Sequence, residues 1–228
     1  MTGLAVATLL FLGLHLIVSG TRLRGLIVGA IGERPYLGLF SLASLGAIIW
    51  MVLAYNSADL VLLWWLGNGA RHAAYLLMLI AIYLVVAGVT TPNPTAAGGD
   101  KLLAQPQAAH GILKVTRHPF LWGVAVWALA HLLVNGDLAS LVFFGGFGLL
   151  ALIGPHLIDA KLAAKKGEAW TRFAAETSWL PFRAMLQRRV SLGPGELGWW
   201  RLALALAVYG AFLVLLHDWL VGVPLLVL

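Results

Sequence analysis

Six stretches of the chain are almost entirely apolar, and polar connections separate them. These runs are Gly3–Ser19, Tyr36–Tyr55, His72–Val89, Pro119–Val134, Leu138–Ile158 and Leu202–Leu228. About 20 apolar residues are enough for a helix to cross the hydrocarbon core of a bilayer. We therefore predict six transmembrane helices, within a range of five to seven. The last run contains His217, Asp218 and Pro224, so we expect it to kink or end early.

Two shorter features complete this pattern. The apolar stretch Leu60–Leu66 is too short to span a membrane, and its paired tryptophans predict a position at the lipid headgroups. Residues Asp159–Thr177 have the pattern of a helix, which we expect to continue the fifth span out of the membrane. The chain is therefore predicted to be an all-α, multi-pass membrane protein with one transmembrane domain over residues 1–228.

Composition supports this class and excludes others. The chain has 228 residues, of which 61% are hydrophobic and only 11% are charged, against about 25% charged residues in an ordinary soluble domain. A soluble enzyme, a disordered chain or a nucleic-acid-binding domain could not have this composition. The chain has no cysteine, which excludes disulfides, thiolate metal sites and cysteine nucleophiles.

The basic residues gather in alternate connections. The first, third and fifth connections carry three, three and eight of the 15 Lys and Arg residues, which leaves only Arg71 elsewhere. Because cytoplasmic loops are enriched in Lys and Arg, we predict that these connections are cytoplasmic and that both termini lie outside. Arg22 and Arg24 follow the first apolar run where a signal peptide would have small residues, so we interpret that run as a retained span. We expect the protein in a bacterial inner membrane.

Two of the seven histidines lie at matching depths in different predicted spans. His15 is about 18 Å along the first span from outside, and His131 is about 18 Å along the fourth from inside. In a hydrocarbon core about 30 Å thick, both fall near the middle, and no other pair of histidines does so. An ionisable or ligating side chain is costly there and is a functional candidate for that reason.

This pairing suits axial ligation of a haem iron by two neutral imidazoles. The alternative is that each histidine hydrogen-bonds a carbonyl or a polar side chain of a neighbouring helix. A zinc or copper ion is less favoured, because no carboxylate or thiolate shares this depth.

Three basic residues near the inner membrane face are candidates for binding anions. Arg117 and His118 precede Pro119, which is favoured at the first position of a helix. They could bind a phosphate, a carboxylate or a haem propionate, or they could only anchor the helix at the interface. Arg22 could bind a haem propionate or a lipid phosphate, or belong to a solvated charge cluster.

Two family resemblances follow from these motifs. Residues Thr116–Gly123 resemble the RHPxYxG signature of the isoprenylcysteine and phospholipid methyltransferase superfamily, with Phe120 in place of its Tyr. The tail of that superfamily is similar to Asp159, Leu162, Gly167, Trp170, Phe173 and Pro181-Phe182. In that superfamily the Arg-His pair and tail acids help to hold S-adenosylmethionine, whereas this chain has a single Asp159 where the paired Glu would stand.

A closer resemblance covers nearly the whole chain and is to the NnrU family, named from denitrification gene clusters. The residues that carry it are Gly13-Leu14-His15, Ser19-Gly20, Arg22, Gly32-Glu33-Arg34, Tyr36, Thr116-Arg117-His118-Pro119, Ala130-His131-Leu132-Leu133, Asn135-Gly136-Asp137, Asp159-Ala160-Lys161 and Trp179-Leu180-Pro181-Phe182. The plant relative in this family is the zeta-carotene isomerase.

The resemblance implies haem b held by two histidines, and so gives His15 and His131 the roles of metal ligands and catalytic residues. Arg117, His118 and Arg22 become additional cofactor-binding candidates. It further implies that the iron redox state switches ligation to permit isomerisation of a carotenoid-like polyene in the lipid phase. We keep two alternatives: a haem electron-transfer or nitric-oxide-related accessory protein without its own catalysis, and a methyltransferase-like protein that uses His118 and Asp159. We expect no nucleic-acid partner.

Overall fold

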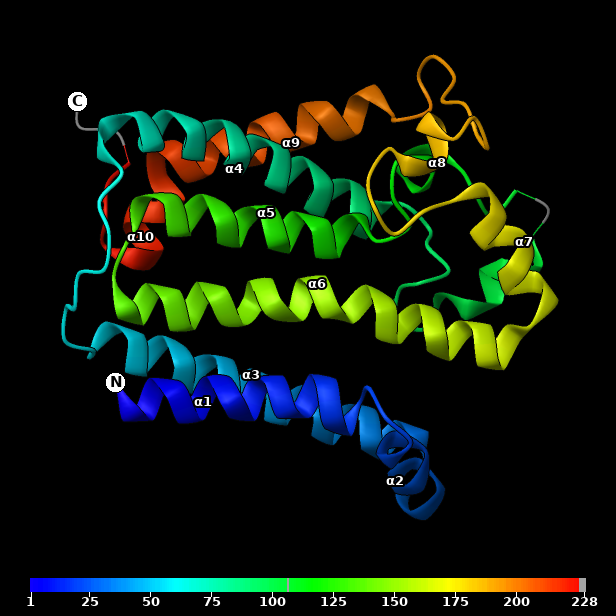
Figure 1. Cartoon of the computed structure of the whole chain (residues 1–228), viewed down its shortest axis with the longest axis horizontal. Helices are drawn as coiled ribbons and strands as arrows, with labels where there is room; N and C mark the ends of the chain where they lie inside the picture. The colour runs from blue at the N-terminus through cyan, green and yellow to red at the C-terminus, as the bar shows by residue number, and fades with distance from the viewer. Residues whose placement is uncertain (106, 226–228) are drawn as a thin grey trace. The chain divides into compact units, whose positions relative to one another are not determined.

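The structure, a computed structural model, describes residues 1–105 and 107–225 (Figure 1). These residues form helices and loops, with one isolated antiparallel bridge between Leu62 and Asp137. The all-α prediction is confirmed. The α-helices are α1 Thr2–Gly13, α2 Leu23–Ile31, α3 Glu33–Asn56, α4 Gly67–Thr90, α5 Pro119–Val134, α6 Leu138–Lys166, α7 Glu168–Glu176, α8 Arg183–Leu186, α9 Trp199–Ala211 and α10 His217–Val221. Two π-helical turns, η1 Leu14–Val18 and η4 Phe212–Leu216, and two 3₁₀ helices, η2 Gly99–Ala104 and η3 Gly111–Lys114, complete the set.

Local chemistry explains where several of these helices begin. Gly32 has φ +87°, a conformation that costs glycine little, and α3 starts at the next residue with an acidic side chain in its first turn. Helix α5 begins at Pro119, as expected for a proline at the first helical position. The carboxylate of Asp137 accepts a hydrogen bond from the backbone N–H of Ser140 and so caps α6.

The membrane-spanning helices agree with the predicted class but not fully with the predicted number. Among the described residues, four helical segments are long and apolar enough to cross a membrane: α3, α4, α6 and the run Trp199–Val221. A fifth span results if α1 with η1 is joined to α2, although the two parts are bent by 81°. Helix α5 is apolar but has only 16 residues. The fourth predicted span is therefore present as a helix, α5, that is short for a straight crossing, and the predicted orientation of the termini stays a prediction.

Three local expectations need correction or refinement. The predicted helix over Asp159–Thr177 is broken at Gly167, whose φ of +51° ends α6 and lets α7 begin. The connection after the first span contains helix α2, which the charge pattern did not predict. Residues Leu60–Leu66 were predicted to lie at the lipid headgroups, which stays a prediction, and the structure shows that they are not helical. Instead, the backbone N–H groups of Leu63 and Trp64 donate to the carbonyl of Gly136 at 2.7 and 3.0 Å.

The chain divides into two compact units, which are described separately. The first comprises Met1–Ala74 and Ala128–Ile158. Within it, α1 packs along α3, and the two helices run side by side (Figure 1). Leu4, Ala7, Phe11, Ala47 and Met51 are buried in this unit. Helix α6 approaches α1 closely at Gly146, because this residue has no Cβ. A Cβ there would collide with the side chain of Thr8.

The second unit comprises Tyr75–Trp127 and Asp159–Leu228. Helices α4 and α5 approach closely here, since a Cβ on Gly88 would lie 2.6 Å from the backbone nitrogen of Phe120, and one on Gly123 would lie 2.7 Å from the side chain of Val85. The loop before α5 is tied to the end of α6 by ion pairs from Lys165 and Lys166 to Asp100, at 3.0 and 2.9 Å. This unit therefore holds the polar segments that lie at one end of its helices.

Candidate functional site

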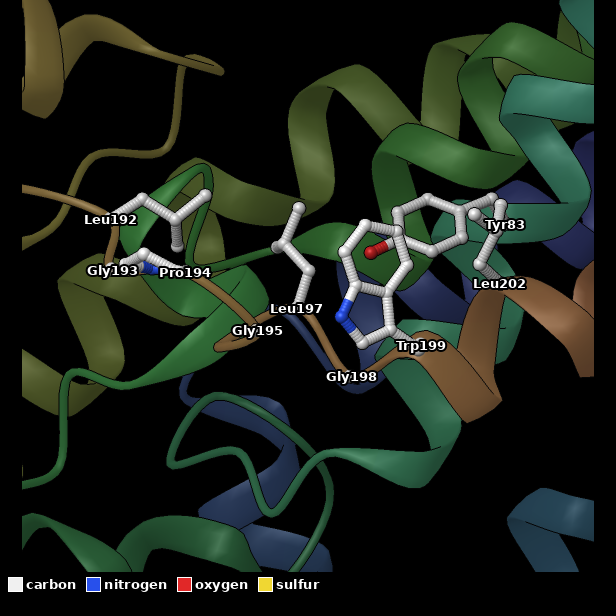
Figure 2. Close-up of a pocket in the computed structure, with 9 residues that line it drawn as sticks. All are labelled: Tyr83, Leu192, Gly193, Pro194, Gly195, Leu197, Gly198, Trp199 and Leu202. Carbon is white, nitrogen blue, oxygen red and sulfur yellow. The ribbon is translucent and has the colours of Figure 1, made fainter.

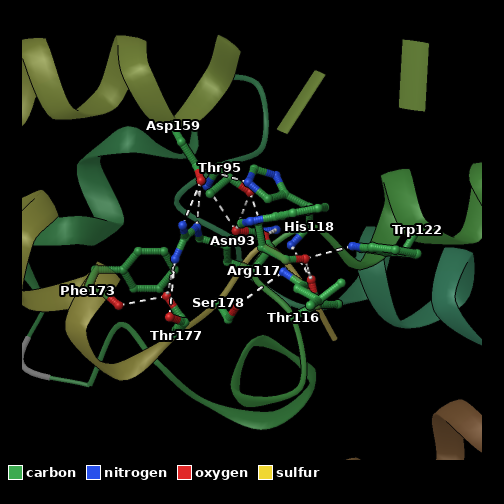
Figure 3. Close-up of polar contacts among 12 residues, drawn as sticks. Asn93, Thr95, Thr116, Arg117, His118, Trp122, Asp159, Phe173, Thr177 and Ser178 are labelled. Atoms are coloured by element: carbon green, nitrogen blue, oxygen red, sulfur yellow. Dashed lines mark hydrogen bonds and ion pairs between the residues drawn. The ribbon is translucent and has the colours of Figure 1, made fainter. Parts of the chain in front are cut away.

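A charged cluster forms in the second unit, where the residues before α5 meet the polar part of α6. Asp159 on α6 accepts hydrogen bonds at Oδ2 from Nε and Nη2 of Arg117, at 2.9 and 2.7 Å (Figure 3). Its other oxygen, Oδ1, lies 2.8 Å from Nε2 of His118. The three side chains are 11%, 16% and 1% exposed for Arg117, Asp159 and His118. The carboxylate is thus shared between two basic groups in a nearly water-free environment.

The guanidinium of Arg117 has further contacts on its other side. Its Nη1 donates to the carbonyl of Thr177 at 3.2 Å, and its Cζ lies 5.2 Å from the ring centre of Trp170. A guanidinium over an indole face is attracted by the ring electrons. Arg117 therefore joins α7 and the segment after it to the start of α5.

The backbone of Arg117 is also held. Its carbonyl accepts hydrogen bonds from the side chains of Asn93 and Thr95, at 3.1 and 2.7 Å, and its N–H donates to the carbonyl of Ser178 at 2.9 Å. Sequence reasoning missed Asn93, Thr95 and Ser178. The signal available was weak: Asn93 lies between two prolines, a context typical of a turn whose side chain bonds the backbone.

Two tryptophans pack beside the charged cluster. The carbonyl of Trp179 accepts from the Thr116 hydroxyl at 2.8 Å and from the indole N–H of Trp122 at 2.7 Å. The rings of Trp122 and Trp179 stack with centres 6.1 Å apart. The motif around Arg117 and His118 is thus locked into the fold by its own neighbours, and its strong donors are turned toward Asp159 and backbone carbonyls.

His15 lies in the first unit, in the π-helical turn η1 that continues α1. Its Nδ1 is 2.9 Å from the carbonyl oxygen of Phe11. Because a carbonyl only accepts, the neutral ring carries its proton on Nδ1, which leaves the Nε2 lone pair available. The imidazole packs against the rings of Phe11 and Phe40, with centres 4.4 and 5.1 Å away. This is how a ligand histidine is commonly oriented, with its second nitrogen fixed by a backbone carbonyl.

His131 lies on α5 in the same unit. Its imidazole stacks on the ring of Phe144, with centres 4.5 Å apart and planes at 19°. Phe147 lies on α6 four residues after Phe143 and three after Phe144, so it shares a helix face with each of them. Their rings continue in contact to Phe11, through centre distances of 5.1, 5.3 and 5.0 Å. Phenylalanine rings therefore connect the surroundings of the two histidines that the sequence paired by depth.

A buried hydroxyl near His15 has no hydrogen-bond partner in the described part of the chain. The ring of Tyr36 stacks on Phe40 with centres 5.8 Å apart, and Tyr36 is only 4% exposed. Its hydroxyl has no hydrogen-bond partner among the described residues, an arrangement that costs about 1–3 kcal/mol unless a ligand or water satisfies the group. The guanidinium of Arg24 lies 5.3 Å from the Tyr36 ring and pairs with Glu33.

The remaining candidate, Arg22, directly precedes α2 and is exposed. It makes no ion pair with any residue in 1–105 or 107–225, whereas its neighbour Arg24 contacts the aromatic group that includes Tyr36. The structure thus places His15 and His131 in one unit and Arg117 with His118 in the other. The roles predicted for these residues in binding a cofactor stay predictions.

The first unit fits a haem better than a bare metal ion. No group of three or more His, Asp or Glu side chains that could hold a metal ion occurs within the part of the chain that the structure describes. A haem needs only one or two protein ligands, apolar walls and partners for its propionates. The free Nε2 of His15, the phenylalanine rings and the unpartnered Tyr36 hydroxyl match these three needs.

Comparison with known proteins decides the family. A family model described as NnrU protein matches residues 3–225. The chain belongs to the NnrU protein family. Among curated proteins, this NnrU protein is 27% identical over 168 residues to the Zea mays protein named 15-cis-zeta-carotene isomerase, chloroplastic, an alignment that covers 71% of this chain and 45% of the relative.

A second relative has the same name in Arabidopsis thaliana. It is 37% identical over 81 residues, which cover 35% of this chain and 22% of that protein. This NnrU protein therefore spans less than half the length of the curated relatives that it matches. No solved structure matches it.

Proposed function

We propose that this NnrU protein binds haem b through His15 and His131 and isomerises a double bond of an apolar, carotenoid-like polyene within the membrane. The observation that carries the proposal is the state of His15, whose Nδ1–H is held by the Phe11 carbonyl while Nε2 stays available beside aromatic rings. The two relatives named as zeta-carotene isomerases support the reaction class.

The side chains of the first unit can perform separate parts of this function. His15 and His131 are neutral nitrogen donors, and the carbonyl of Phe11 fixes which nitrogen of His15 is available. The rings of Phe11, Phe40 and Phe144 pack against the two imidazoles and provide apolar surroundings for them. Tyr36 and Arg24 would meet the propionates, since the Tyr36 hydroxyl lacks an acceptor. Bound haem would supply an iron centre whose ligation changes with its redox state.

The proposed reaction makes modest demands on the protein. Isomerisation rotates one carbon–carbon double bond and exchanges no atom or electron with solvent in the net reaction. The protein must hold an apolar chain away from water and lower the barrier to rotation. An interior of phenylalanine rings within a membrane-spanning unit meets the first demand.

An absorption spectrum of the detergent-purified protein, oxidised and then reduced with dithionite, tests haem binding. We expect a Soret band and sharp reduced α and β bands, with haem b identified as the pyridine haemochrome. His15→Ala and His131→Ala should each abolish or shift the Soret band. His72→Ala is the matched control, because Nδ1 of His72 also contacts the carbonyl four residues earlier, at 3.2 Å, but its side chain is exposed. Equal spectra for all three variants would exclude the ligand assignment.

Chromatography of a cis-carotenoid incubated with the reduced and the oxidised protein tests the reaction. We expect the isomer ratio to change only with reduced protein, and to stay unchanged with His15→Ala. A normal haem spectrum without any change in isomer ratio would favour the electron-transfer or accessory function. Calorimetry with S-adenosylmethionine tests the methyltransferase-like alternative, which requires this ligand to bind. The structure does not favour such binding, because the side chains of Arg117 and His118 already bond the carboxylate of Asp159.

A further inference from the structure

An apolar cavity of about 470 Å³ lies in the second unit, at the start of α9. Its walls are the loop 192–198, the first turn of α9 and one side chain of α4, Tyr83 (Figure 2). Tyr83 is seven residues before the end of α4, so the cavity extends about 10 Å along that helix from its end. The volume is within the range of small-molecule sites, about 300–1,000 Å³.

The position of the cavity relates it to the edge of the membrane. Trp199 lines the cavity, is 76% exposed and begins the apolar run Trp199–Val221, and Trp200 follows it. Tryptophans at the end of a membrane-spanning helix are typical of the headgroup level. The cavity thus opens where lipid headgroups lie and extends toward the depth of their acyl chains.

A cation lies against the wall of this cavity. A Cβ added to Gly198, which lines the cavity, would lie 2.6 Å from Nη1 of Arg201. The guanidinium is held by Thr90, whose hydroxyl accepts from Nε at 3.0 Å and whose carbonyl accepts from Nη2 at 3.3 Å, and it lies 4.6 Å from the ring centre of Trp200. No carboxylate among residues 1–105 and 107–225 forms an ion pair with Arg201. A guanidinium has five N–H donors, so several are left for an anion.

The other charges near the cavity cancel one another. Glu196 lies in the loop that lines the cavity, and Lys114 pairs with it at 2.7 Å. The backbone N–H of Gly193 also donates to this carboxylate at 3.1 Å. Among the described residues, Arg201 is therefore a positive charge beside the cavity that no carboxylate opposes.

We propose that this cavity is a binding site for an anionic phospholipid of the membrane, with an acyl chain in the cavity and the phosphate on the guanidinium of Arg201. A neutral polyene would use the cavity but not the charge, and free phosphate would use the charge but not the cavity. A phospholipid uses both, and the rim of tryptophans places the headgroup. The charge pattern of the loops predicts that this end of the helices is cytoplasmic, where anionic lipids attract basic residues. The site does not depend on haem binding.

Native mass spectrometry of the detergent-purified protein with added lipid tests this inference. The probes are phosphatidylglycerol and phosphatidylcholine with identical acyl chains. We expect the wild-type protein to retain one phosphatidylglycerol about fivefold more tightly than phosphatidylcholine, since both lipids carry the phosphate but only phosphatidylcholine carries a choline cation that offsets the attraction to a basic residue. Arg201→Gln should remove that preference. Leu197→Trp, which fills the cavity with an indole, should weaken retention of both lipids.

Two control variants and a measurement of folding complete this experiment. Arg172→Gln removes the same charge from an exposed position on α7 and should leave retention unchanged. Arg201→Lys keeps the charge and should keep most of the preference. The midpoint of thermal unfolding, followed by circular dichroism, shows that each variant is folded.

Other outcomes would overturn the proposal. Equal retention by Arg201→Gln and Arg172→Gln would mean that the guanidinium does not bind the lipid. If inorganic phosphate displaced phosphatidylglycerol while Leu197→Trp had no effect, only a surface anion site would exist. Equal retention of the two lipids, unchanged in Arg201→Gln but lost in Leu197→Trp, would indicate an apolar ligand that binds without the guanidinium.

Discussion

The imidazole of His118 lies 2.8 Å from the carboxylate of Asp159, across 41 residues of sequence, and is only 1% exposed. Arg117 binds the other oxygen of the same carboxylate. A carboxylate that bonds two adjacent residues of one segment fixes both their position and their direction. The contact therefore ties the start of α5 to α6 at the point where α6 becomes polar.

Removing this carboxylate should destabilise the protein strongly. We expect Asp159→Asn to lower the free energy of unfolding by about 3 kcal/mol, because Arg117 is left as a mostly buried charge without its counter-ion. Titration with SDS, followed by far-ultraviolet circular dichroism, measures the effect. Glu168→Gln is the control: its pair with Arg172 is exposed and should contribute less than about 1 kcal/mol. Similar losses in both variants would contradict a special role for Asp159.

Adjacent glycines of α6 should respond differently to substitution. A Cβ on Gly146 would lie 2.6 Å from Cγ2 of Thr8, whereas one on Gly145 has only a side-chain carbon at 3.8 Å. We expect Gly146→Ala to destabilise the protein by about 1–3 kcal/mol through overpacking, and Gly145→Ala to have little effect. The same SDS titration compares the two. A neutral Gly146→Ala would show that α1 can move away from α6 at no cost.

The loop before α5 should become loosely held in acid. Hydrogen bonds from Lys166 and Lys165 lower the pKa of Asp100 from 3.8 to about 2. A carboxyl with a lowered pKa in the folded state stabilises the fold fully above its ordinary pKa, and that contribution falls as the pH drops toward about 2. Pepsin digestion of the segment 91–118 should therefore accelerate between about pH 4 and pH 2.

Asp100→Asn provides the check on this pH dependence. The variant should be cleaved faster than wild type at pH 4. Its cleavage rate should also lack the rise between pH 4 and pH 2 that protonation of Asp100 causes in the wild type. Because Lys165 is 66% exposed, the contribution to stability should be below about 1 kcal/mol. An unaltered pH profile in the variant would assign the acid sensitivity to other groups.

The cap of α6 makes a further prediction. Asp137 accepts from the N–H and the hydroxyl of Ser140 at 2.8 and 2.6 Å, and the Ser140 hydroxyl also contacts the hydroxyl of Tyr55 at 2.8 Å. Asp137→Ala should cost about 1 kcal/mol of stability, a usual effect of losing a helix cap, and Asp137→Ser should restore most of it. Hydrogen exchange of the first turn of α6 should increase in the alanine variant only.

The sequence predicted the helical class and most helix limits because apolar runs in a membrane protein must satisfy their backbone polar groups by forming helices. The fourth run and α5 have the same limits, Pro119–Val134, because a proline marks the start and the Asn135-Gly136-Asp137 turn marks the end. The limits that failed depended on single residues. Gly167 ends α6 by adopting a positive φ, and a pattern of apolar positions does not reveal that conformation.

The candidate site was predictable where helical spacing or a motif determined it. Depth along the chain paired His15 with His131, which lie in the same compact unit, and their role as ligands stays a prediction. A spacing of four residues could have added Phe11. Asp159, the ion-pair partner of Arg117, lies on a helix, whereas Asn93, Thr95 and Thr177 reach Arg117 from turns with no periodicity and were not predictable. The contact between Tyr36 and Arg24 also required the 81° bend, which nothing in the hydropathy pattern indicated.

The π-helical turn at His15 contains a backbone bond from the N–H of Ser19 to the carbonyl of Leu14, five residues back. Such a turn holds one residue more than the α-helix that it interrupts. Deleting one residue after His15, such as Ile17, would restore regular α-helix and rotate all that precedes it by about 100° relative to all that follows. The direction in which the His15 imidazole points is therefore set by the number of residues in the turn. A single insertion or deletion there would change this direction without replacing any residue that the imidazole contacts.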